Sequence, residues 1–201
     1  MAGEDACGPE THAHESSGIT KGDRKTEIMS VLIYPDTIKS SSSFCGRAAR
    51  IFADKSYHST SMRDISRATN VSLAGLYHYC KSKEELLFLI QDNCFGRVLE
   101  RLEERLRRRS TIRLAMLTIF IENHLSFFAA NMAEMKVLSH EAESLQGDLH
   151  AHVSGKKDKY TKLASRILRE IDSDSSLKQA VDLTVATYAL FGMMNWISQL
   201  V

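Results

Sequence analysis

The residues best suited to bind a charged partner lie in one stretch, between Lys39 and Lys83. This stretch holds eight basic residues and two acidic ones, a net charge of +6 in a chain whose total is +1. A positive segment joined to an acidic body is what binding to a nucleic-acid backbone requires. A solvated basic surface without a partner explains the charge equally well. The secondary structure that carries these residues is therefore needed to choose between the two interpretations.

Two of these elements are predicted at the start of the stretch. A helix is expected from Asp36 until the pattern is interrupted at 55–57, because apolar residues recur at three- and four-residue steps. These residues are Phe44, Ala48, Ile51 and Phe52. A second, short helix follows, in which Ser61 and Asp64 form a capping-box signature and Ala68 lies near the end.

A tight turn at 69–71 separates this short helix from a third one, for which Ser72 is a favourable N-cap. The small core between the second and third helices is expected to comprise Ile65, Ala68, Val71, Leu76 and Tyr79. The residues expected to face outward are Ser72, Leu73, Ala74, Tyr77 and His78. Such an arrangement suits DNA, because the major groove admits one α-helix whose outward side chains meet base edges.

The rest of the chain is predicted to be helical as well. Ser82 and Glu85 form a second capping signature, which begins a long helix reaching about Arg109. Residues 112–128 are apolar nearly all round, which predicts a central helix buried on most of its circumference. Further helices are expected at about 132–145, at 149–171 and from 177 onward. The predicted fold class is therefore all-α.

Four strings of residues in the basic stretch stand in register with one another. They are Thr60-Ser61-Met62-Arg63-Asp64-Ile65-Ser66, Val71-Ser72, Leu76-Tyr77-His78-Tyr79 and Ser82-Lys83-Glu84-Glu85-Leu86. Together they resemble the DNA-binding domain of TetR-type repressors. The resemblance implies an N-terminal three-helix DNA-binding head with a helix-turn-helix, joined to a C-terminal helical ligand-binding and dimerisation bundle. It also implies that Thr60, Ser61 and Arg63 meet phosphates or bases, and that Tyr77, His78 and Lys83 grip the DNA backbone.

The chain departs from the family pattern in several places, among them Gly46 and Arg47 within the first helix and Cys80 in place of an aromatic. Leu73-Ala74-Gly75 stands where a basic residue and glycine are common, and Lys55-Ser56 stands where a glycine commonly closes the first helix. Ser72, Leu73 and Ala74 remain expected DNA contacts. An apolar Leu73 cannot make a bidentate contact to guanine, although it could touch a thymine methyl. The operator sequence is therefore not readable from these residues.

Three regions are expected: a flexible N-terminal arm at 1–35, the DNA-binding domain at 36–83, and the ligand-binding and dimerisation domain at 84–201. The arm lacks the apolar residues needed to offset its ordering entropy. Relatives of this type dimerise through their last two helices, which implies a homodimer on double-stranded, palindromic operator DNA. No further helix is expected after the apolar segment 193–201, so the chain looks shortened by one helix relative to the family.

A second site is expected in the C-terminal bundle, because a regulator of this type needs a ligand that prefers the state unable to bind DNA. The candidate pocket residues are Phe120, His124, Phe127, Met135, Met193 and Asn195. Ordinary core packing explains them too. The strings 135–142 and 190–197 resemble TetR-type regulators of fatty-acid, steroid or aromatic-acid breakdown, which implies a small hydrophobic effector such as an acyl-CoA. Arginines between 105 and 113 are candidates for CoA phosphates, or simply a solvated helix surface.

Other chemistries find little support in the sequence. No nucleophile, base and orienting group form a recognisable pattern, so neither a catalytic site nor a cofactor is expected. His140, Glu141, His150 and His152 are of metal-ligating types but lack diagnostic spacing, so no metal is predicted. The cysteines, Cys7, Cys45, Cys80 and Cys94, are too far apart for a dithiol pair and are interpreted as reduced thiols.

The segment 183–201 carries no charge and is long enough to cross a bilayer. Polar residues interrupt it and no basic cluster flanks it, so a buried interface helix is favoured over a membrane anchor. The first residues are acidic without an apolar core, which excludes a secretory signal and predicts a cytoplasmic protein.

The sequence therefore favours a ligand-responsive transcriptional repressor, released from its operator by a small hydrophobic effector. The alternative is a helical small-molecule or metal-binding protein whose DNA-binding head is no longer competent. Such a protein would show no preference among DNA sequences.

Overall fold

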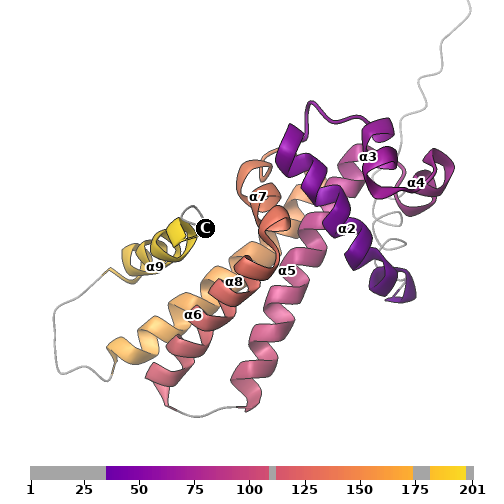
Figure 1. The fold of residues 1–201 in the computed structure, drawn as a ribbon. Coiled ribbons are helices and arrows are strands. Elements are labelled where there is room, and N and C mark those ends of the chain that lie inside the picture. The colour runs from indigo at the N-terminus through magenta and orange to yellow at the C-terminus, as the bar shows by residue number, and fades with distance from the viewer. Residues whose placement is uncertain (1–34, 109–111, 174–181, 198–201) are drawn as a thin grey trace, which may run out of the picture. The chain divides into compact units, whose positions relative to one another are not determined.

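The structure, a computed structural model, describes residues 35–108, 112–173 and 182–197 (Figure 1). The chain divides into two compact units, residues 1–36 and 37–201, and the second is the helical body. All regular elements in the described ranges are α-helices, which confirms the predicted fold class. They are α2 (Pro35–Lys55), α3 (Met62–Thr69), α4 (Leu73–Tyr79), α5 (Lys83–Arg108), α6 (Arg113–Ala130), α7 (Met132–His140), α8 (Gly147–Asp172) and α9 (Leu183–Ile197).

The head consists of α2, α3 and α4, with α3 packed on α4. Ile65 and Leu76 are fully buried between these helices, and Phe44 of α2 stacks on Tyr79 with ring centroids 5.0 Å apart. The expectation that Ala68 belongs to this core is wrong, because Ala68 is exposed and Thr69 is buried. The Thr69 hydroxyl donates to the Ile65 carbonyl at 2.7 Å, so its polar atom is satisfied inside the core.

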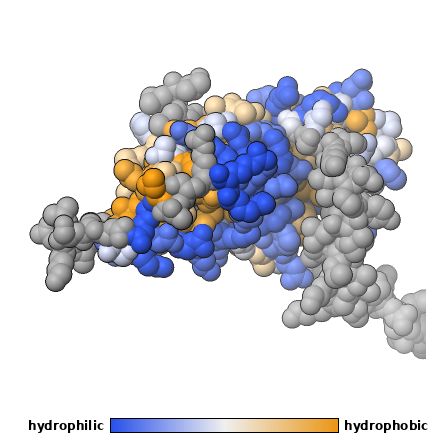
Figure 2. All heavy atoms as spheres, turned by 90° about the horizontal axis from the view of Figure 1, so that it is seen from below, coloured by the Kyte–Doolittle hydropathy of each residue, from blue (hydrophilic) through white to orange (hydrophobic). Residues whose placement is uncertain are grey.

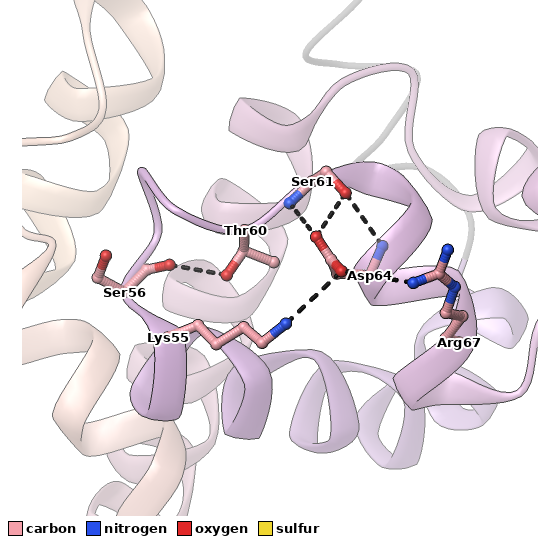
Figure 3. A network of polar contacts seen from close by, with 6 residues as sticks. All are labelled: Lys55, Ser56, Thr60, Ser61, Asp64 and Arg67. Carbon is pink, nitrogen blue, oxygen red and sulfur yellow. Dashed lines mark hydrogen bonds and ion pairs between the residues drawn. The ribbon is translucent and has the colours of Figure 1, made fainter.

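The predicted capping box fixes the start of α3 (Figure 3). The Asp64 N–H donates to Ser61 Oγ at 3.2 Å, and the Ser61 N–H donates back to Asp64 Oδ2 at 3.0 Å. The Ser61 hydroxyl also donates to Asp64 Oδ2 at 2.5 Å. This bond, with that from the Ser61 N–H and with Lys55 Nζ 3.6 Å from the carboxylate, lowers the pKa of Asp64 to about 2. The carboxylate therefore stays charged at the positive end of the helix dipole, where a negative charge is favourable.

The end of α2 is closed by a residue in a left-handed conformation. Ser56 has a φ of 66°, a region that costs residues with a Cβ roughly 1–2 kcal/mol. We expect Ser56→Gly to raise the free energy of unfolding by about 0.5–1 kcal/mol in urea denaturation, because glycine adopts this φ without a steric penalty. Ser59→Gly, at an exposed position of the same connection without positive φ, should instead lower it. Equal losses in both variants would contradict the argument.

The second part of the unit is a bundle in which α5, α6 and α8 pack against one another, α7 packs on α5 and α6, and α9 packs on α6 and α8. Its core is a continuous apolar cluster contributed by all five helices. Phe120 of α6, Leu102 of α5 and Ile167 of α8 are fully buried in it. The bundle therefore has an apolar interior of its own, separate from the small core of the head.

Two predictions for the bundle need correction. The central helix α6 is not buried along its whole length, since Ile112 before it and Leu114 in its first turn are about two-thirds exposed, at 65% and 64%. The helix expected to reach residue 145 ends at His140, because the next residues form a turn. In that turn the Glu141 carbonyl accepts the Gln91 side chain at 3.0 Å, and Leu145 is buried. These tertiary contacts outweigh the local preference for continuing the helix.

Figure 2 shows the molecule from below, turned by 90° about the horizontal axis of Figure 1. Apolar residues gather in the left half of that view, the side on which Figure 1 shows α9, and hydrophilic residues dominate the middle. Among the described residues no helix is both long enough and apolar enough to span a membrane.

Candidate nucleic-acid interface

The turn between α3 and α4 is fixed by backbone geometry and by one side chain. Asn70 adopts a left-handed φ of 55°, and its N–H donates to the Arg67 carbonyl at 3.3 Å. Ser66 Oγ donates to the Val71 carbonyl at 2.6 Å, while the Val71 N–H donates to the Ser66 carbonyl at 3.2 Å. Asparagine tolerates this conformation better than most residues, so the sequence itself specifies a tight turn here.

The start of α4 is equally well defined. Ser72 Oγ accepts the Gly75 N–H at 3.1 Å, which confirms Ser72 as the N-cap. A Cβ on Gly75 would come within 3.1 Å of Val71 Cγ1, so glycine allows the helix to begin close to the turn. Leu76 then anchors the buried side of α4.

The opposite side of α4, together with the start of α3, forms an outward surface that we call the reading surface. Its members are Ser61, Arg63, Ser72, Leu73, Ala74, Tyr77 and His78. Tyr77 is 49% exposed although it is aromatic, and Leu73 is half-buried. An exposed tyrosine and histidine on α4 and an exposed arginine on α3 offer hydrogen-bond donors and flat rings to a phosphate backbone and to base edges.

Two residues expected to contact DNA bind backbone carbonyls of the chain itself. Thr60 is 2% exposed, and its hydroxyl donates to the Ser56 carbonyl at 2.7 Å. Lys83 Nζ donates to the carbonyls of Tyr57 and Thr60 at 3.0 and 3.1 Å, and it lies 4.4 Å from the centre of the Tyr57 ring. Both side chains therefore hold the connection that leads into α3.

Family models match both the head and the bundle. Residues 46–90 match the family model described as bacterial regulatory proteins, tetR family. Residues 113–199 match a second model, described as tetracyclin repressor-like, C-terminal domain. The chain belongs to the TetR family of transcriptional regulators. The helix-turn-helix of this TetR-family chain is thus α3, the turn at 70–72 and α4.

Individual relatives agree with this assignment. The chain is 24% identical over 148 residues to the fatty acid metabolism regulator protein of Bacillus subtilis. The aligned region covers 74% of this chain and 76% of that protein. The crystal structure of the TetR-family regulator PfmR from Thermus thermophilus superposes with a TM-score of 0.70 at 26% identity, over 78% of this chain and 83% of that one. AibR, solved in complex with isovaleryl coenzyme A and operator DNA, gives a TM-score of 0.69 at 27% identity, over 78% and 84%.

The expected pocket residues differ in burial among the described residues. Phe120, Phe127 and Met135 are packed in the bundle core with exposures of 9% or less. Met193 was expected to line the pocket, but its side chain is 64% exposed. It lies on the other face of α9 from Leu190 and Met194, which are buried. The alternative of ordinary core packing accounts for the three buried members.

His124 is the polar centre of this core. Its ring nitrogens lie 3.2 Å from the Tyr160 hydroxyl and 3.2 Å from Asn195 Oδ1, so one side chain of α6 connects α8 with α9. The ring stacks on Phe128 with centroids 4.0 Å apart. Burial lowers the pKa of His124 to about 4, so the imidazole is neutral at physiological pH. An amide oxygen can only accept, so this contact requires the neutral ring to carry its proton on Nε2.

An open groove of about 850 Å³ lies elsewhere, along α5 and α8 with one contribution from α6. It is lined by Glu103, Leu106, Arg107, Met116, Gly155, Lys159, Lys162, Leu163 and Arg166. Glu103 pairs with Lys159 at 2.7 Å, which leaves the lining strongly positive around apolar Leu106, Met116 and Leu163. We call this the basic groove. It can hold a ligand that is both anionic and apolar.

Most residues that line the basic groove were not predicted from the sequence. Of the arginines noted there, Arg107 lines it, while Arg105 pairs with Glu122 and Arg108 with Glu104, both at 2.6 Å. Arg109 lies outside the described residues. The spacing of Lys159, Lys162, Leu163 and Arg166 is the signal that could have revealed the groove, since steps of three and four residues share one helix face.

The residues of metal-ligating type are dispersed. His140 Nδ1 lies 2.9 Å from the Lys136 carbonyl and His152 Nε2 lies 2.9 Å from Asp92, while Glu141 is buried beside Tyr57. Over the described ranges, no three histidine, cysteine or acidic side chains come close enough together to hold a metal ion.

Three of the four cysteines lie in the described part of the chain, where Cys45, Cys80 and Cys94 are buried and form no disulfide with one another. Burial raises the pKa of Cys80 and of Cys94 to about 12, so neither thiol is ionised at neutral pH. Cys7 lies outside the described residues.

Proposed function

We propose that this chain is a cytoplasmic repressor that binds a palindromic operator as a homodimer and leaves it when an amphipathic anion, of the acyl-CoA class, binds the bundle. The observation that carries the proposal is the two-sided character of α4. Leu76 is fully buried, while Ala74, Tyr77 and His78 on the other side are exposed. A short helix held in this way by α3 and a tight turn is suited to enter the major groove.

The contacts to DNA fall to the reading surface. Arg63 and His78 reach phosphates, Tyr77 reaches the backbone beside the groove, and Leu73 and Ala74 face bases as apolar contacts to thymine methyl groups. Thr60 and Lys83 support this surface rather than contact DNA, because their polar atoms are engaged by backbone carbonyls of the same connection. In this proposal residues 36–83 bind DNA and residues 84–201 bind the effector, and α5 begins at the boundary between the two domains.

A second copy of the chain would cover the free face of α9. Val185, Tyr188, Met193 and Trp196 are each 63–65% exposed, a density of large apolar residues that isolated surface helices rarely show. To bind a palindromic operator, the pair has to present its two α4 helices about one DNA turn apart, roughly 34–36 Å.

The basic groove is the site that we propose for the effector. An acyl-CoA combines phosphates with an apolar chain, and the groove combines Arg107, Lys162 and Arg166 with apolar Leu106, Met116 and Leu163. The structure of AibR with isovaleryl coenzyme A and the name of the Bacillus subtilis relative support this ligand class. It replaces the pocket around Phe120 and His124 as the preferred site.

The deciding experiment is selection of preferred sequences from random duplexes by the full chain, followed by affinity measurements on the selected duplex. We expect Arg63→Ala to weaken binding by about 10-fold and to reduce the salt slope by about one. Tyr77→Ala should weaken binding by a similar factor. Lys157→Ala, an exposed cation on α8, is the matched control and should leave affinity unchanged.

The same complex tests the effector. Acyl-CoAs of increasing chain length should release the duplex, and Lys162→Glu with Arg166→Glu should abolish this response while operator affinity is retained. If the chain selects no duplex yet still binds an acyl-CoA, the alternative of a helical ligand-binding protein with an incompetent head replaces this proposal.

A further inference from the structure

The connection between α2 and α3 is held from both sides by charged side chains of distant elements. The backbone N–H of Tyr57 donates to Glu141 Oε1 at 3.0 Å in a buried contact. The Tyr57 carbonyl accepts from Lys83 Nζ at 3.0 Å. One residue thus lies between a carboxylate at the end of α7 and an ammonium at the start of α5. Charge-assisted hydrogen bonds of this kind are stronger than neutral ones, so they fix the connection firmly.

Both carboxylate oxygens of Glu141 and its backbone carbonyl accept hydrogen bonds from the protein. Its Oε2 accepts the Ser144 hydroxyl at 2.7 Å, and its backbone carbonyl accepts Gln91 Nε2 at 3.0 Å. The residue is only 8% exposed. A buried carboxylate is costly unless hydrogen-bonded, and here the bond to Oε1 comes from the head. The position of Glu141 and the position of Tyr57 are therefore tied together.

The two ends of this contact lead to the two functional sites. Ser61, the N-cap of α3 and a member of the reading surface, comes four residues after Tyr57 in the chain. On the other side, the turn at 141–146 leads directly into α8, which carries Lys159, Lys162 and Arg166 of the basic groove. The Gln146 N–H also donates to Glu84 Oε1 at 3.3 Å, so this turn lies against the first turn of α5.

We infer that Glu141 is a positioning residue for DNA binding, which sets the orientation of α3 according to the position of the turn between α7 and α8. The inference rests on the proposed function for its consequence in regulation. A displacement of the turn moves the acceptor for the Tyr57 N–H, and α3 moves with it. By linkage, a state that binds DNA well holds this contact, and loss of the contact favours the state that binds DNA poorly.

The test compares amide hydrogen exchange with operator affinity in the full chain. Glu141→Ala removes the acceptor, Glu141→Gln keeps an acceptor of the same size without the charge, and Ser144→Ala removes the neighbouring hydrogen bond without touching Tyr57. We expect exchange of the amides at 57–64 to rise at least 10-fold in Glu141→Ala, less in Glu141→Gln and not in Ser144→Ala. Exchange in the core of α6 should be unchanged, and affinity for the selected duplex should fall in the same order.

Two results would overturn the inference: wild-type exchange at 57–64 in both Glu141 variants, or an equal rise throughout the chain, which would mark a purely structural role. If the wild-type chain selects no duplex, the proposed function fails. The exchange comparison needs no DNA, so it still decides whether Glu141 orders the head.

Discussion

Tyr188→Glu combined with Trp196→Glu is expected to convert the chain to a monomer and to weaken operator binding by at least about 100-fold. Both side chains are 65% exposed on the free face of α9, while Thr187, Leu190 and Met194 on its other face are buried against the bundle. Two charges on the free face would have to be desolvated in a dimer, which prevents pairing. A monomer then loses the second half-site and with it the gain from bivalent binding, about 10²–10⁴-fold.

Sedimentation analysis gives the oligomeric state, and fluorescence anisotropy on the selected duplex gives the affinity. Ala129→Glu adds one such charge at an exposed position on α6 and serves as the control. The proposed dimer surface would have to be abandoned if the doubly substituted chain still sediments as a dimer and retains its affinity.

His124 is expected to make the unfolding free energy depend on pH in a specific window. The neutral imidazole is stable in the folded core, where its pKa is lowered to about 4, whereas the unfolded chain takes up a proton near 6.5. The contribution of the neutral His124 ring to the free energy of unfolding is therefore fully present above pH 6.5, and it is lost as the pH falls from 6.5 to 4. The integrated loss is about 3 kcal/mol, since each pKa unit corresponds to about 1.4 kcal/mol.

Urea denaturation at half-unit pH steps measures this dependence. His124→Phe keeps an aromatic ring against Phe128 and should flatten the profile between pH 6.5 and 4, even though Tyr160 and Asn195 lose a partner. His78→Phe changes an exposed histidine and should leave the profile as in the wild type. A wild-type slope that persists in His124→Phe would show that other groups cause it.

The local elements of the head could be predicted because their signals lie within four residues of one another. The capping box of Ser61 and Asp64 and the cap from Ser72 to Gly75 are such signals, and the structure confirms both. The left-handed Asn70 is likewise specified by its own residue type. These short-range bonds need no knowledge of tertiary structure, so the boundaries of α3 and α4 were accessible from the sequence.

What could not be predicted depends on contacts between distant segments. Glu141 drew attention only as a metal-ligand type, because the bond to Tyr57 spans 84 positions. Lys83 resembled a phosphate ligand, but its ammonium finds three backbone carbonyls at 57, 58 and 60. The groove needed the pairing of α5 with α8, which periodicity alone does not give. The DNA contacts themselves stay predictions.

The continuity of α5 has a mechanical consequence. One continuous helix of 26 residues, about 39 Å long at 1.5 Å per residue, reaches from Lys83 at the head to Arg107 at the groove. A tilt of about 5° at the groove end would carry its other end through about 3 Å. That arc is large compared with the tolerance of a hydrogen bond, roughly 0.5 Å. If an effector binds the basic groove as proposed, small movements of α5 there would be magnified at the head.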